Sequence, residues 1–72
     1  MDFTVLIHPT EEGGYWAEVP AFPGCFTQGE TIEETLQNAK DAIECHIEAL
    51  KEDGQPIVGD AGLIISRVQI AA

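Results

Sequence analysis

One segment limits the possible folds more than any other: the stretch from Thr31 to Gly54, which the sequence predicts to be a long helix. Thr31 and Glu34 have the spacing of a capping box, in which the hydroxyl and the carboxylate each accept a hydrogen bond from a free amide at the helix start. Gly54 suits the left-handed residue that ends a helix, and Pro56 follows where a helix cannot continue. A helix of about 20 residues is about 30 Å long, so its apolar side needs an extended partner.

The apolar residues of this segment recur with helical spacing and fall within an arc about 80° wide. They are Ile32, Leu36, Ala39, Ile43, Ile47 and Leu50. The acidic and polar residues lie mostly on the other side. We therefore expect this apolar stripe to pack on a sheet.

Three short segments before the helix have the alternating pattern and composition of strands. They cover residues 2–8, 15–19 and 25–28. Gly13 and Gly14 suit a hairpin loop because glycine tolerates a positive φ, and Pro23-Gly24 suits the two central positions of a turn. Connections this short predict an antiparallel meander.

Residues 63–70 are β-branched and apolar on both faces, which predicts a fourth strand. The expected fold is therefore a single α+β domain over residues 1–72, in the order β-β-β-α-β, with one helix on one face of one sheet. A strand that is apolar on both faces needs further cover, and the helix leaves one sheet face open. Both features indicate a subunit interface, so we expect a homo-oligomer.

The charge balance is unusual: 13 acidic residues and three basic ones give a formal net charge of −10. Such a surface repels nucleic acids and anionic lipids and attracts basic proteins. No apolar run is long enough to span a membrane. The start of the chain lacks a signal peptide, so the two cysteines are expected to be reduced thiols in the cytoplasm.

The strand, turn and helix positions together resemble the HicB-type antitoxin family. The residues that carry the resemblance are Gly14-Tyr15, Glu18-Val19-Pro20, Pro23-Gly24-Cys25, Thr27, Gly29, Thr31, Glu33-Glu34, Leu36, Asn38-Ala39, Ala42 and the run from Glu52 to Ile57. The resemblance implies a partial RNase-H-like fold without nuclease activity, with its last strand beside the first. It also implies binding to a small basic HicA-type toxin that cuts messenger RNA. The DNA-reading segment that many members carry after this domain is missing here, so no direct DNA binding is expected.

The predicted function is therefore that of an antitoxin that works by protein binding and not as an enzyme. The alternative is a free-standing homo-oligomeric module that binds another protein or a small ligand. The residues proposed for partner contact are Glu11, Glu12, Tyr15, Phe22, Pro23 and Gly24, and those proposed for structure are Gly13, Gly14, Thr31, Glu34 and Gly54. Trp16 is interpreted either as an interface anchor or as a core residue.

Other chemistry is disfavoured by the sequence. An RNase-H-like nuclease needs carboxylates on its strands to hold metal ions, and here the last strand has none. The four soft metal ligands His8, Cys25, Cys45 and His46 match no paired spacing, so neither a metal site nor a cofactor is expected. His46 is predicted to be half-buried, His8 to be solvated and Cys25 to be a packing residue.

Overall fold

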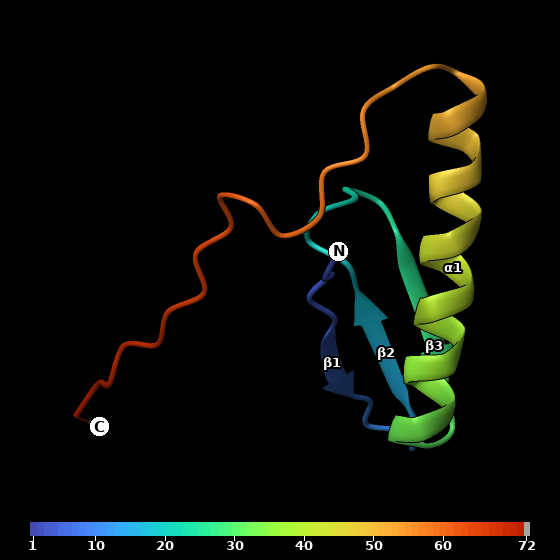
Figure 1. Cartoon of the computed structure of the whole chain (residues 1–72). Helices are drawn as coiled ribbons and strands as arrows, with labels where there is room; N and C mark the ends of the chain where they lie inside the picture. The colour runs from blue at the N-terminus through green and yellow to red at the C-terminus, as the bar shows by residue number, and fades with distance from the viewer. Residues whose placement is uncertain (72) are drawn as a thin grey trace.

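A computed structural model describes residues 1–71 as a three-stranded sheet with one helix on one face, followed by an extended segment (Figure 1). The strands are β1 (Leu6–Pro9), β2 (Tyr15–Glu18) and β3 (Phe26–Gly29). The helix α1 spans Ile32–Glu52. The sheet order is β1-β2-β3, and both pairings are antiparallel. The predicted meander and the α+β class are thus confirmed. No helix in the described residues is long and apolar enough to cross a membrane.

The strand register assigns each side chain to one face of the sheet. Ala17 lies opposite Ile7 and Thr27 on the face that the helix covers, and its side chain is fully buried. The alternate positions form what we call the open sheet face, which has no helix on it. Its residues are Leu6, His8, Trp16, Glu18, Phe26 and Gln28.

The helix begins and ends as its sequence predicts. Thr31 is the N-cap, and its hydroxyl accepts a hydrogen bond from the Glu34 amide at 3.0 Å. The Glu34 carboxylate accepts one from the Glu30 amide at 3.2 Å. At the other end Gly54 has a φ of 68°, and the Gln55 amide donates to the Leu50 carbonyl.

The core lies between the helix and the strand-to-strand connection 19–25. Val19, Phe22, Cys25 and Ile43 are buried together, with Phe3, Val5, Ala21, Ala42, Ile47 and Leu50 packed around them. The helix packs mainly over β3 and then over β2, so it covers the sheet off centre (Figure 1).

Two members of the predicted apolar stripe do not reach the core. Ile32 and Leu36 are about half exposed, and the fully buried residue of the first turns is Thr35. Because Gly29 has no side chain, the helix start lies against β3 on the Thr35 side. This contact rotates Ile32 and Leu36 away from the sheet. The hydroxyl of Thr35 donates to the Thr31 carbonyl at 2.7 Å, which removes the penalty for burying it.

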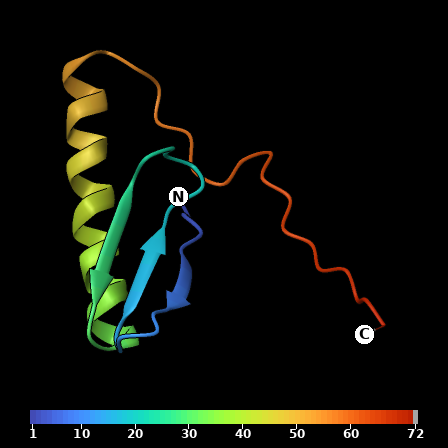
Figure 2. The ribbon, with the colours of Figure 1, turned by 180° about the vertical axis from the view of Figure 1, so that it is seen from behind.

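The predicted fourth strand is the element in which the structure differs from the sequence analysis. Residues 63–70 are extended and exposed, and they pair with no strand in the described chain. The chain turns at Asp60, where the Leu63 amide donates to the Asp60 carbonyl at 2.9 Å, and Gly62 has a φ of 83°. This turn directs the following residues away from the sheet (Figure 2).

Candidate interaction surface

A hollow lies where the β1–β2 turn meets the start of the helix. Its volume is about 380 Å³, and its lining residues are Thr10, Glu12, Gly13, Gly14, Tyr15, Gln28, Gly29, Glu30, Glu34 and Asn38. We call it the acidic hollow, because three carboxylates and no basic side chain line it. A cationic side chain is the ligand that such a set of groups favours.

The turn that forms one wall of the hollow is fixed by its own hydrogen bonds. The Thr10 amide donates to the Gly14 carbonyl at 3.1 Å, and the Gly13 amide donates to the Thr10 carbonyl at 3.3 Å. The hydroxyl of Thr10 also donates to the Gly13 carbonyl. Gly13 and Gly14 both have positive φ, as the sequence predicts. The opposite wall is joined to the sheet by Asn38, whose amide donates to the Gln28 carbonyl at 2.7 Å.

The open sheet face carries a row of stacked rings. His8 and Trp16 are parallel with ring centroids 4.2 Å apart, and Trp16 meets Phe26 edge to face at 6.1 Å. Phe26 is 64% exposed and Trp16 is 37% exposed. Aromatic residues that remain exposed on a folded domain are typical of binding surfaces. Sequence reasoning missed Phe26, although its alternation with Thr27 gave the signal.

The aromatic row and the acidic hollow are neighbours. Gln28 lies beside Trp16 on the open sheet face and also lines the hollow. Glu18 adds a carboxylate to the row, with its Oε2 atom 3.4 Å from His8 Nε2. We call the hollow and the row together the candidate surface. It offers a stacked apolar centre with carboxylates at its margin.

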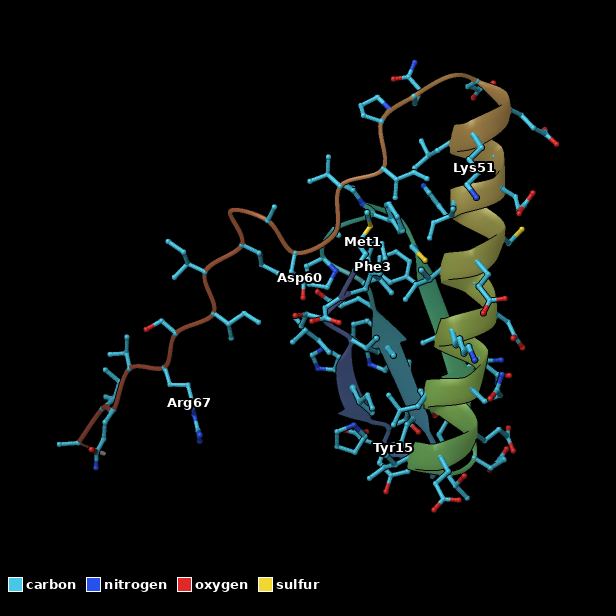
Figure 3. All side chains as sticks on the ribbon, in the orientation of Figure 1. Met1, Phe3, Tyr15, Lys51, Asp60 and Arg67 are labelled. Atoms are coloured by element: carbon cyan, nitrogen blue, oxygen red, sulfur yellow. The ribbon has the colours of Figure 1, made fainter. Side chains whose placement is uncertain are left out.

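The structure brings together only some of the residues predicted to contact a partner. Glu12 and Tyr15 line the acidic hollow, and Glu11 is exposed in the same turn. Pro23 and Gly24 are exposed in the connection beyond the other end of β2. Tyr15 lies at the foot of the sheet in Figure 3, beside the helix start.

Phe22 is among the residues proposed for partner contact, but the structure buries its side chain in the core. Its side chain is only 5% exposed. It packs against Phe3 with ring centroids 5.1 Å apart and stacks on His46 at 4.3 Å. The turn places Pro23 and Gly24 outside, with the Cys25 amide donating to the Phe22 carbonyl at 2.9 Å, and so Phe22 points into the core.

The remaining histidines and cysteines have structural surroundings. His46 is half-buried, as predicted, and covers one face of the Phe22 ring. Cys25 is buried in the core, and burial raises the pKa of its thiol. Among residues 1–71, no three histidine, cysteine or acidic side chains gather in an arrangement that would hold a metal ion.

The sequence was compared with known protein families. The model of the HicB-like antitoxins of bacterial toxin–antitoxin systems matches residues 3–69. The chain therefore belongs to the HicB-like antitoxin family.

Two individual relatives illustrate the range of sizes in this family. The UPF0150 protein Ta0767 of Thermoplasma acidophilum is 50% identical over 60 residues, which are 83% of this chain and 87% of that protein. Antitoxin HicB 1 of Photorhabdus laumondii is 41% identical over 64 residues, which are 86% of this chain but 41% of the relative. The longer relative thus has a large part with no counterpart in the chain.

Solved structures of the antitoxin HicB of Burkholderia pseudomallei have the same fold. One crystal structure of that antitoxin matches with a TM-score of 0.72 and 35% identity, covering 79% of this chain and 43% of the other. The structure of its N-terminal domain matches with a TM-score of 0.68 and 34% identity, covering 81% of this chain and 67% of the other. The predicted antitoxin-type fold is confirmed by these matches.

Proposed function

We propose that this protein is the antitoxin of a bacterial toxin–antitoxin pair and neutralises a small basic HicA-type toxin in the cytoplasm by binding it. Membership of the HicB-like antitoxin family supports this proposal, as does the relative named as an antitoxin. The net charge of −10 is the electrostatic complement that a cationic, RNA-cleaving partner requires. In this proposal the protein acts by occupying a surface of its partner and catalyses no reaction.

The candidate surface is the observation that supports binding most directly. The rings of Trp16 and Phe26 are already exposed, so a partner can contact them without any change in the core. A tryptophan in the centre of an interface is a frequent hot spot, and truncating one typically weakens binding by about 2 kcal/mol or more. We propose that these rings contact the toxin and form the apolar centre of the interface.

The acidic hollow would then receive a lysine or arginine of the toxin. Glu12 and Glu30 line it, and so does Glu34, which also caps the helix. A toxin that grips RNA has cationic groups where phosphates bind. Carboxylates facing those groups would compete with the RNA backbone, which connects binding to loss of ribonuclease activity.

The test is to co-express the protein with any short basic protein encoded next to its gene and to measure complex formation and growth rescue. The wild type is expected to co-purify with that toxin and to restore growth. Trp16→Ala is expected to weaken the complex at least 30-fold, which corresponds to about 2 kcal/mol. Glu12→Gln with Glu30→Gln is expected to slow association several-fold at low salt, with a smaller effect at high salt.

A matched control is Glu48→Gln with Glu52→Gln, which removes the same charge from exposed helix positions outside the acidic hollow. This control should bind at nearly the wild-type rate. Equal effects of both pairs would show that only net charge matters and would contradict the placement of the interface. Failure to bind any basic partner encoded nearby would favour the alternative, a module that binds another protein or a small ligand.

A further inference from the structure

The segment 63–70, which we call the arm, is extended and mostly apolar but is not part of any sheet. Ile64, Val68 and Ile70 are each more than 70% exposed, and Ile65 is 61% exposed. β-branched residues in this density are typical of strands that are buried or paired. An exposed apolar segment of this kind readily forms a strand by pairing with an unpaired sheet edge.

The same chain has an unoccupied place for one more strand. β1 is at the edge of the sheet, and its outer side has no neighbour among the described residues. Because the helix lies over β3 and β2, a groove of about 490 Å³ remains between the β1 side of the sheet and the helix. The groove is lined by Met1, Asp2, Phe3, Val5, Leu36, Lys40, Ile43 and Glu44.

The other edge of the sheet is less suited to a strand. On β3 the Gln28 carbonyl already accepts a hydrogen bond from the Asn38 side chain. The helix also crosses close to this strand (Figure 1). The β1 edge is therefore the one where an added strand would find both unpaired backbone groups and an apolar groove.

The arm fits this place in length and in pattern. Eight residues of strand extend about 26 Å, which is longer than the four residues of β1 along which the arm would pair. Ile64, Val68 and Ile70 share one face of the arm, and Leu63, Ile65, Arg67 and Gln69 share the other. The first face would enter the groove and cover Leu36. The second would extend the open sheet face, where Ile65 adds apolar area and Arg67 and Gln69 remain in contact with water.

Residues 60–62, which come just before the arm, direct it away from the β1 edge of its own sheet. The Asp60 amide donates to the Asp2 carbonyl at 3.1 Å, and the Asp60 carboxylate accepts from the Thr4 amide at 2.8 Å and the Thr4 hydroxyl at 2.7 Å. The turn at Gly62 then carries the chain outward, and Arg67 lies far from Asp60 and from the sheet in Figure 3. Because residues 60–62 are held against the start of the chain and the arm extends outward, the arm can reach a neighbouring molecule.

We propose that the arm of one copy pairs along the β1 edge of a second copy and fills its groove, while the second arm does the same in return. The result is a two-fold symmetric dimer with exchanged strands, in which each sheet has four strands. Both sides of the exchange come from the same sequence, so no other partner is needed to cover the groove. The open sheet face stays free in this dimer, so the dimer is compatible with the proposed function and does not depend on it.

The experiment measures the molar mass in solution of the full chain and of paired variants. In the arm variant, Ile64→Asp and Val68→Asp place two charges on the groove side. In the control variant, Gln69→Asp and Ala71→Asp place the same charges on the other side. Leu36→Asp alters the groove at a position already exposed in the monomer. We expect two chains per particle for the wild type and the control, and one for the arm variant and for Leu36→Asp.

Mixing the arm variant with Leu36→Asp distinguishes exchange of arms between two copies from pairing of each arm with its own sheet. The arm variant keeps an intact groove, and Leu36→Asp keeps an intact arm. An equimolar mixture should therefore form a heterodimer held by one arm, although neither variant dimerises alone. Circular dichroism before mixing checks that both variants are folded. Any of three results would overturn the proposal: a monomeric wild-type protein, an arm variant that still dimerises, or a mixture of the two variants that stays monomeric.

Discussion

Gly29 and Thr35 are so close that a methyl group at Gly29 would lie 2.7 Å from both the backbone nitrogen and the hydroxyl oxygen of Thr35. Real Cβ atoms do not approach other atoms to that distance. The contact joins the end of β3 to the first turn of α1 and thereby sets which side of the helix faces the sheet.

Gly29→Ala is therefore expected to destabilise the domain by about 1–3 kcal/mol, because the helix start must move away from β3. Chemical denaturation measures this change in the free energy of unfolding. Thr35→Ala in the same background tests the cause, since removing the hydroxyl relieves one of the two contacts. The two changes should then be less than additive, whereas full additivity would contradict a shared contact.

Phe22 and Phe26 form a matched pair of the same residue type in opposite environments. Phe22→Ala removes a buried ring and should lower the free energy of unfolding by about 3–5 kcal/mol, which is most of the stability of a small domain. Phe26→Ala removes an exposed ring and should change it by less than about 1 kcal/mol. Thermal or urea unfolding followed by circular dichroism compares the two. A large loss from Phe26→Ala alone would show that the open sheet face is covered in solution.

The two thiols should react at very different rates. Cys45 is exposed, whereas Cys25 is buried and its pKa is raised by that burial, so little of it is thiolate at neutral pH. A colorimetric thiol reagent should therefore modify one cysteine quickly in the folded protein and the second only on unfolding. Because the folded state favours the protonated thiol of Cys25, its contribution to stability should be complete at neutral pH. That contribution should fall as alkaline pH approaches the raised pKa. Cys25→Ala should remove the slow phase, and two equally fast thiols would contradict the buried position.

The carboxylate of Asp60 holds the 60–62 turn against the start of the chain. Asp60→Ala removes two hydrogen-bond acceptors from Thr4, so the Thr4 amide should exchange with solvent faster in hydrogen-exchange measurements. The amides of β2 and β3 should keep their protection, since they pair within the sheet. Asp53→Ala, an acidic-to-alanine change at the helix end, serves as the control and should leave Thr4 unchanged. Unaltered exchange in Asp60→Ala would show that this contact is not formed in solution.

Local pattern in the sequence was enough to predict several features of this protein. The helix limits follow from Thr31, Glu34 and Gly54, because capping and left-handed backbone depend on residues a few positions apart. The meander follows from short strands separated by glycine and proline turns. The family also followed from the sequence, since its motifs run through nearly the whole chain.

Tertiary contacts decided the features that depend on distant residues. The periodicity of the helix predicted a buried Leu36, but the close approach that Gly29 permits places Thr35 against the sheet instead. Phe22 is buried because its turn points inward, and no local pattern shows that direction. Residues 63–70 have the composition of a strand, yet a strand needs a partner along its edge, and the turn at Asp60 directs them away from their own sheet. Backbone propensity is local, whereas pairing and burial depend on which surfaces meet.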